Sequence, residues 1–183
     1  MKVLDIVLMA ADILGIKDEV EMYFEDGTEI KAAEAKKLVA SFHLAECSLA
    51  LDYIPLHAEE QVHALSGRVE YSALQGSPVR ILGVTDVKGN PIAYTVYSTY
   101  IKTTSGVVLV HYTYTPRLKT VEEECSYNIM GADNLLVYGT LSEFCLGEGL
   151  VAEAAEWERK WKDLVATIYH TSKCKRLGSR TWI

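Results

Sequence analysis

Residues 107–115 read VVLVHYTYT, and this stretch decides the fold class. Bulky side chains fall on both of its alternating faces, and alternation with a period of two is typical of a β-strand. One face comprises Val108, Val110, Tyr112 and Tyr114, and the other comprises Val107, Leu109, His111 and Thr113. A strand with two bulky faces predicts a small barrel or sandwich, or a sheet that docks one face on a neighbouring element.

The preceding residues continue this β-rich character. From Gln61 to about Pro116 the chain is rich in Val, Ile, Thr and Tyr. Short clusters of glycine, proline, serine and asparagine interrupt it, and such clusters are typical of turns between strands. We therefore expect antiparallel strands at 79–84, 92–101 and 107–115.

Helical patterns precede the strands. Residues 3–14 are mostly apolar and predict one helix. A longer helix is expected at 29–54, because apolar residues recur there every three or four positions and Pro55 ends the pattern. The face that this helix should bury comprises Ala35, Leu38, Phe42, Ala45, Leu49 and Tyr53.

Helical patterns also follow the strands. Residues 134–146 predict one helix, which Gly147 and Gly149 should end. Residues 150–170 predict another, with apolar positions spaced alternately by four and three residues, as in a packed helical bundle. The expected bundle-core positions are Leu150, Ala154, Trp157, Trp161, Leu164 and Ile168.

The order of these elements predicts an α+β fold. Isolated helices of these lengths are marginal in water, so the N-terminal and C-terminal helices should bury their apolar faces on each other. We expect a bundle of about four helices with an antiparallel β-module, a small barrel or sandwich, inserted in one crossover. The expected divisions are 1–60 and 121–170 for the bundle, 61–120 for the β-module and 171–183 for a C-terminal arm.

Composition excludes several classes of protein. The chain has 183 residues, a formal charge of −7 and 49% hydrophobic residues, which excludes disordered and low-complexity classes. The acidic balance argues against an extended nucleic-acid-binding face. Because Asp5 and Asp12 interrupt the apolar N-terminus and no long apolar run occurs, we expect no secretion signal, no membrane partner and an intracellular protein at synthesis.

Charge is distributed unevenly along the chain. Residues 1–60 carry −8, residues 61–120 carry +4, residues 121–160 carry −7 and residues 161–183 carry +4. Copies of such a chain could dock head to tail, with a basic region of one copy against an acidic region of the next. The alternative is that the surface charge is merely patchy.

Few residues point to catalysis or metal binding. His43 and Cys47 have the i,i+4 spacing of two metal ligands, but a pair of core residues is the preferred interpretation. His57, Glu59, Glu60 and His63 could form a general acid/base site after Pro55, although a solvated connector is preferred. No nucleotide-binding, hydrolase or zinc-protease motif occurs, so we predict no enzyme, metal or cofactor. The four cysteines should be reduced, with Cys47 and Cys145 in the core.

The C-terminal residues form a basic segment without apolar periodicity. Arginine and tryptophan are enriched among residues that dominate binding energy, because each buries a large area or makes several directed hydrogen bonds. The segment is therefore either an arm that binds a partner or a tail whose tryptophan folds back on its own bundle. The residues expected to bind are Lys175, Arg176, Arg180, Trp182 and Ile183.

The C-terminal third resembles a known family. The residues that carry the resemblance are Tyr138-Gly139, Glu143-Phe144-Cys145-Leu146, Gly149, Glu153-Ala154, Trp157-Glu158-Arg159-Lys160-Trp161 and Arg176-Leu177-Gly178-Ser179-Arg180-Thr181-Trp182-Ile183. They resemble the ending of tailed-phage head-to-tail connectors, the portal adaptors of the T7-type tail tubular protein A (gatekeeper) family. Helices at both ends and a β-module between them also fit that family over nearly the whole chain.

The resemblance implies a structural virion protein of a bacteriophage. It implies a ring, usually dodecameric, that docks on the portal protein and presents a platform to the downstream tail or nozzle proteins. Genome DNA would pass through the lumen without being read, and Arg176, Arg180 and Trp182 would belong to the portal-binding arm. The alternatives are a small-ligand-binding or enzymatic α+β protein that uses the Pro55–His63 region, and a helical interaction module of a host regulator.

Overall fold

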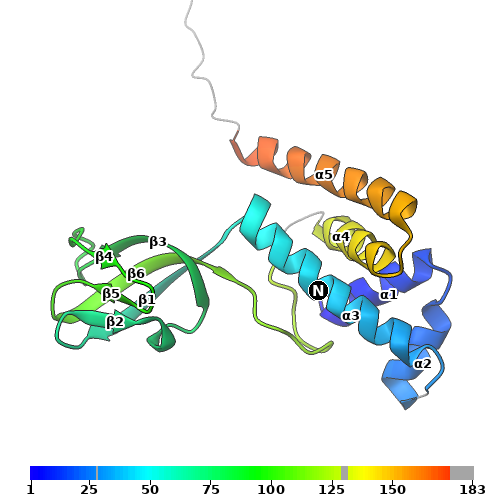
Figure 1. The fold of residues 1–183 in the computed structure, drawn as a ribbon, viewed down its shortest axis with the longest axis horizontal. Coiled ribbons are helices and arrows are strands. Elements are labelled where there is room, and N and C mark those ends of the chain that lie inside the picture. Colours follow the sequence, from blue (N-terminus) through cyan, green and yellow to red (C-terminus); the bar gives the residue numbers. More distant parts are fainter. Residues whose placement is uncertain (28, 129–131, 174–183) are drawn as a thin grey trace, which may run out of the picture. The chain divides into compact units, whose positions relative to one another are not determined.

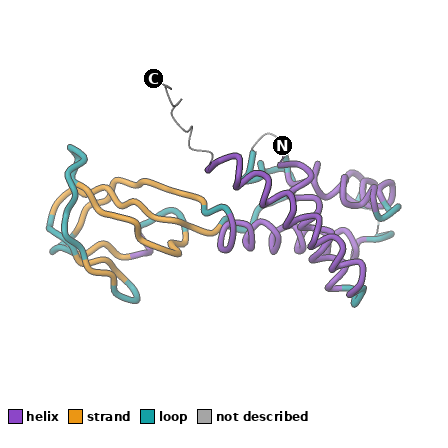
Figure 2. The backbone as a smooth tube through the Cα atoms, turned by 90° about the horizontal axis from the view of Figure 1, so that it is seen from above, coloured by secondary structure: helices purple, strands orange, loops and turns teal. Residues whose placement is uncertain are grey.

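Helices occupy both ends of the chain and strands occupy its middle (Figure 1). The computed structural model describes residues 1–27, 29–128 and 132–173. The chain divides into two units, one of Met1–Ala45 with Tyr127–Ile183 and the other of Glu46–Ser126. All the named strands belong to the second unit (Figure 2), so the predicted α+β fold with an inserted sheet module is confirmed.

The helical unit contains both ends of the chain. Its helices are α1 (Val3–Ile13), α2 (Lys17–Asp26), most of α3 (Ala32–Ser48), α4 (Ala132–Gly147) and α5 (Val151–Lys173). The helices expected at 3–14, 134–146 and 150–170 are therefore confirmed to within a few residues. The long helix expected at 29–54 begins at Ala32, and its last turn, Leu49–Tyr53, is π-helical.

Helix α4 is the central helix of this unit. Its buried residues are Leu135, Leu136, Val137, Thr140, Leu141, Ser142, Phe144 and Cys145, and they point in all directions around the helix axis. A helix that is apolar on all sides must be covered by several neighbours. Helices α1 and α5 both contact α4, so the N-terminal and C-terminal segments share one core, as expected.

The predicted core of α5 is correct in part. Ala154 and Trp161 are each 5% exposed, and Trp157, Leu164 and Ile168 are half-buried. Leu150 is 45% exposed, so its assignment to the core was wrong. Gly149 has a φ of 77°, and Leu150 lies in the turn before α5, where its N–H donates to the Cys145 carbonyl at 2.9 Å.

Close packing joins three helices at Gly139. A Cβ atom at this position would lie 3.0 Å from the Cβ of Ala45 and 3.1 Å from Cε2 of Trp161. Ala45 belongs to α3 and Trp161 to α5, and both side chains are buried. Glycine at position 139 therefore lets the indole of Trp161 lie directly against the backbone of α4.

The second unit contains two antiparallel sheets. The first has the order β1 (Leu56–Ala64), β6 (Gly106–Thr115), β3 (Ser77–Thr85), and the second has the order β2 (Arg68–Glu70), β5 (Tyr100–Lys102), β4 (Thr95–Val96). The strands expected at 79–84 and 107–115 are confirmed. The single strand expected at 92–101 was wrong, because a tight turn divides it and the Tyr97 N–H donates to the Tyr100 carbonyl at 2.9 Å.

The two sheets share one core. Val108, Val110 and Tyr112 on β6 are buried together with Val69 of β2 and Ile101 of β5. The opposite face of β6 is more open, since Val107 is 42% exposed and His111 is half-buried. Of the arrangements that the two bulky faces allowed, the structure therefore has a small sandwich.

The unit boundaries differ from the expected divisions after residues 60 and 120. They fall after Ala45 and after Ser126. The cluster at 57–63, expected to be a solvated connector, lies within β1, which pairs with β6 along its whole length. The loop after β6 also belongs to the sheet unit, because Lys119 and Ser126 bind Glu46 at the end of α3.

We predict that Gly139→Ala destabilises the helical unit. Alanine should gain about 1 kcal/mol in helix propensity, but overpacking against Ala45 and Trp161 should cost about 1–3 kcal/mol. Thermal unfolding should therefore show a lower midpoint for this variant. Gly147→Ala is the matched control, because nothing lies within 4 Å of its Cβ position, and its midpoint should stay constant or rise. A raised midpoint for Gly139→Ala would contradict the packing argument.

Candidate functional site

The arm predicted from the sequence cannot be placed in the fold. Its residues, Lys175, Arg176, Arg180, Trp182 and Ile183, lie outside the described part of the chain. The second prediction concerned the Pro55–His63 region, and there the structure places a cavity.

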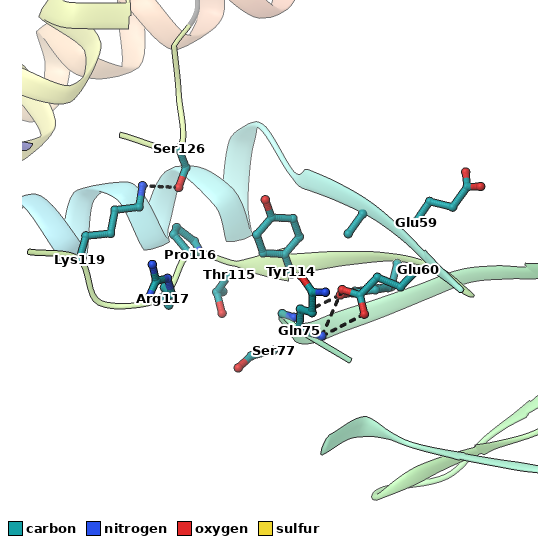
Figure 3. Close-up of a pocket in the computed structure, with 13 residues that line it drawn as sticks. Glu59, Glu60, Gln75, Ser77, Tyr114, Thr115, Pro116, Arg117, Lys119 and Ser126 are labelled. Atoms are coloured by element: carbon teal, nitrogen blue, oxygen red, sulfur yellow. Dashed lines mark hydrogen bonds between the residues drawn. The ribbon is translucent and has the colours of Figure 1, made fainter. Parts of the chain in front are cut away.

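This cavity lies within the sheet unit and has a volume of about 510 Å³. Strand β1 contributes Ala58, Glu59 and Glu60, and β6 contributes Tyr112, Tyr114 and Thr115. The rest of the lining comes from the segment that enters β3 and from the loop that follows β6, as Figure 3 shows: Gln75, Gly76, Ser77, Pro116, Arg117, Lys119 and Ser126. The cavity therefore has carboxylate, phenol and cationic groups in its wall.

Glu60 is held in a network of hydrogen bonds. The Gln75 N–H donates to its Oε1 and Oε2 at 3.1 and 3.0 Å, and the Tyr112 hydroxyl donates to Oε1. The Gly76 N–H in turn donates to the Tyr112 hydroxyl at 3.3 Å. These bonds fix the segment before β3 against β1 and β6 (Figure 3).

The Tyr112 hydroxyl stays protonated at neutral pH. Burial, and then the hydrogen bond to Glu60, raises the pKa of Tyr112 to about 12. A phenol with so high a pKa is a donor to Glu60 and not a base. The pair therefore holds the segment before β3 to the sheet through a phenol that remains a hydrogen-bond donor.

Glu46 and Lys119 form a buried ion pair, and Lys119 also lines the cavity. Their side chains are 1% and 10% exposed, and Lys119 Nζ lies 2.9 Å from Glu46 Oε1. Lys119 also donates to Ser126 Oγ at 2.6 Å, and the Ser126 N–H donates to Glu46 Oε1 at 2.5 Å. The two residues therefore fix the loop after β6 to the C-terminal end of α3.

The charges that line the cavity are thus engaged with protein groups. Glu60 accepts hydrogen bonds from Gln75 and Tyr112, Lys119 pairs with Glu46, and the exposed Arg117 pairs with Glu123. Catalytic acids and bases need a reacting group within hydrogen-bond reach and a pKa suited to their task. The charged side chains that line the cavity therefore stabilise the fold through their protein partners.

The histidines of the Pro55–His63 region do not converge. Along β1, Glu60 and His57 belong to opposite faces, and Glu60 alone of these two lines the cavity. His57 and His63 are six positions apart, which at about 3.4 Å per strand residue separates them by roughly 20 Å. The acid/base cluster considered from the sequence is therefore not assembled.

A second polar network crosses the open face of the first sheet. His111 Nε2 lies 3.1 Å from Thr85 Oγ1, and His111 Nδ1 lies 3.3 Å from Glu59 Oε2. A hydroxyl, an imidazole and a carboxylate in this order resemble a nucleophilic triad. However, neither His111 nor Thr85 lines the cavity described above. The network is better explained as a cross-strand contact that stabilises the sheet.

Sequence patterns did not single out Glu46, Tyr112 or Thr85 as network members. Glu46 follows the core residue Ala45 on the predicted helix. A carboxylate next to a core position was the sequence signal that could have indicated a buried ion pair. Within the described residues, no group of three His, Cys, Asp or Glu side chains could hold a metal ion. Cys145 is buried as expected, whereas Cys47 is half-buried and lies 3.9 Å from the Pro116 carbonyl.

Comparison with known proteins gives no match to a protein-family model or to a curated protein. The resemblance to portal adaptors therefore rests on the C-terminal residues and on the order of the elements. None of the helices in residues 1–27, 29–128 and 132–173 is both long and apolar enough to span a bilayer.

We predict that Lys119→Met strongly destabilises the protein. It would leave the Glu46 carboxylate buried without its counter-charge, at a cost of about 3–5 kcal/mol. Chemical denaturation should show this loss, and Glu46→Gln/Lys119→Met should recover part of it, because a neutral amide oxygen can still accept from the Ser126 N–H. Arg117→Ala removes an exposed ion pair and should change stability by less than about 1 kcal/mol. Equal effects of Lys119→Met and Arg117→Ala would contradict the buried pair.

We also predict that Tyr112 makes the folded state sensitive to alkali. Because its folded pKa of about 12 lies above the ordinary value of 10, its stabilising contribution is complete below pH 10 and is lost between pH 10 and 12. The stability difference between wild type and Tyr112→Phe should therefore shrink over that interval. Tyr114→Phe is the matched control and should keep the wild-type pH dependence. A constant difference between wild type and Tyr112→Phe up to pH 12 would contradict the raised pKa.

Proposed function

We propose that this chain is a structural virion protein, a phage head-to-tail adaptor whose copies form a ring on the portal. One observation carries the proposal: the N-terminal and C-terminal helices share a core around α4, and the β-module is inserted between them. This arrangement fits the family that the C-terminal motifs resemble. Trp157 and Trp161 belong to those motifs. In the shared core, Trp161 is buried and Trp157 packs against Tyr138 of α4.

The proposal makes the protein a non-enzymatic one. The charged residues that line the cavity are bound to other protein groups: Glu60 to Gln75 and Tyr112, Lys119 to Glu46, and Arg117 to Glu123. The Thr85–His111–Glu59 network lies on an open sheet face. Both arrangements stabilise a rigid module, which is what a ring subunit requires.

The charge of the chain suits a channel for DNA. A net charge of −7 would keep a polyanion from adhering to the ring wall, so the genome would pass without being read. Under this proposal the protein resides at the head–tail interface of the virion. Its partners are further copies of itself, the portal protein on one side and tail or nozzle proteins on the other.

The cavity favours a second candidate function. A volume of about 510 Å³ lies in the range of small-molecule sites, which is about 300–1,000 Å³. A small polar ligand that contacts Glu59, Ser77 and Arg117 would fit its lining. A thermal-shift screen with a metabolite panel tests this alternative, and a reproducible shift that Ser77→Trp abolishes would favour it over a purely structural cavity.

We predict that removal of residues 174–183 abolishes portal binding. Circular dichroism and thermal unfolding of the truncated chain are the control for folding, because the truncation keeps every named helix and strand. Co-sedimentation with purified portal rings from the same genome should be lost, and the triple variant Arg176→Ala/Arg180→Ala/Trp182→Ala should behave in the same way. Arg159→Ala, an exposed arginine on α5, is the matched control and should bind normally.

Electron microscopy of the full chain on portal rings completes the test. A ring of density added to one end of the portal would support the adaptor function. Full binding by the truncated chain would remove the arm from the proposal, and absence of binding by the full chain would overturn the proposal itself.

A further inference from the structure

The outer face of the second sheet carries an exposed basic and aromatic surface. Arg68 on β2 lies directly opposite Lys102 on β5, and Tyr100 lies two residues from Lys102 on the same face. Arg68, Lys102 and Tyr97 are exposed, and Tyr97 is 42% so. We name Arg68, Lys102, Tyr97 and Tyr100 the basic–aromatic face; β2, β4 and β5 are labelled in Figure 1.

Glu70 shares this face, but neither of the two cations is paired with it. Neither Arg68 nor Lys102 forms an ion pair with any described residue. Like charges directly opposite each other on neighbouring strands destabilise a sheet. An external carboxylate group would relieve this repulsion, so the pair is suited to an acidic partner.

The aromatic residues of the face form a rigid stack. The Tyr97 and Tyr100 rings are 4.6 Å apart with planes inclined by 10°, and the Arg68 guanidinium lies 4.8 Å from the centre of the Tyr100 ring. Tyrosine and arginine are enriched among residues that dominate binding energy. Because the stack is already ordered, binding there would cost little side-chain entropy.

Helix α2 carries the complementary surface. Asp18, Met22, Glu25 and Asp26 are all exposed, and their spacing of four, three and one residues places them on one side of the helix. The opposite side is anchored in the helical unit by Val20, which is fully buried. We name these four residues the acidic α2 face; its centre is a methionine that is 45% exposed.

We propose that the basic–aromatic face of one copy binds the acidic α2 face of the next copy. Carboxylates of Asp18 and Glu25 would pair with Arg68 and Lys102, and the Met22 thioether would pack on the tyrosine stack, a contact that sulfur and aromatic rings favour. The contact joins two separate chains and uses only the surface of each unit. It rests on the proposed ring, because a heterologous head-to-tail contact closes into a ring when its rotation allows.

The composition of the face favours a protein partner over a nucleic acid. Glu70 lies opposite Tyr100 on the same face and would repel a phosphate backbone. Two spaced carboxylates need to contact only Arg68 and Lys102, whereas a continuous run of phosphates would also meet Glu70. A surface of four residues is small for a stable interface, so the contact should be weak in free solution and should depend on salt.

Zero-length cross-linking tests the contact directly. Carbodiimide treatment of an equal mixture of ¹⁴N and ¹⁵N chains should yield mixed-isotope peptides that join Lys102 to Asp18, Glu25 or Asp26. Sedimentation velocity should show association at about 0.01 M salt, where the Debye length is about 30 Å, and much less at about 0.15 M, where it is about 8 Å. A chain that stays monomeric at low salt and gives no such peptide would overturn the proposal.

A charge exchange provides the decisive control. Arg68→Glu/Lys102→Glu and Asp18→Lys/Glu25→Lys should each lose self-association, and an equal mixture of the two should regain it. Lys88→Glu/Arg159→Glu changes the net charge as the first variant does, but at exposed positions outside the face, and should associate as wild type does. All variants should retain the wild-type circular dichroism spectrum.

Three results would overturn the contact. The first is unchanged association of Arg68→Glu/Lys102→Glu, the second is an equal loss in Lys88→Glu/Arg159→Glu, and the third is single-stranded DNA binding that depends on Arg68 and Lys102. The adaptor function can fail separately, since portal binding is tested with residues 174–183. Portal binding without the predicted cross-links would leave the adaptor proposal in place and remove this contact.

Discussion

The contact of Gly139 with Ala45 and Trp161 is the constraint on which the helical unit depends. It brings α3, α4 and α5 together at a point where a single methyl group would be too close to its neighbours. Close-packed interiors tolerate little change in volume, so this point fixes how the helices approach one another. Because α3 comes from the N-terminal part of the chain and α4 and α5 from the C-terminal part, the contact also joins the two ends of the sequence.

The place of the β-module in the chain is consistent with this contact between helices from both parts of the sequence. The chain leaves the helical unit after Ala45 and returns at Tyr127, so the intervening residues must form a unit of their own. Two devices stabilise this unit besides its apolar core. The Glu46–Lys119 pair fixes the loop after β6 to the end of α3, and the Glu60–Tyr112 pair fixes the segment before β3 to its sheet.

The polar networks determine which charged groups are free to bind another molecule. Their charged groups are bound to partners within the sheet unit. In contrast, Arg68 and Lys102 on the second sheet have no ion pair within the described residues. Under the proposed contact, this unbalanced charge and the opposite charge on α2 would let copies recognise each other.

The sequence alone determined the fold class and the location of most elements. Strong periodicity in 107–115 and in the helical segments reflects which side chains must leave water, and that requirement is local along the chain. The tertiary structure decided the turns and the strand pairings, which the periodicity of side chains does not predict. It assigned Leu150 to a turn and divided 92–101 into two strands, through local backbone hydrogen bonds that side-chain periodicity does not report. It also turned the expected connector at 57–63 into part of β1, because that strand exists only through its pairing with β6, a distant part of the chain. The same reason applies to the pairing of Glu46 with Lys119, since two charges 73 positions apart meet only when the chain is folded.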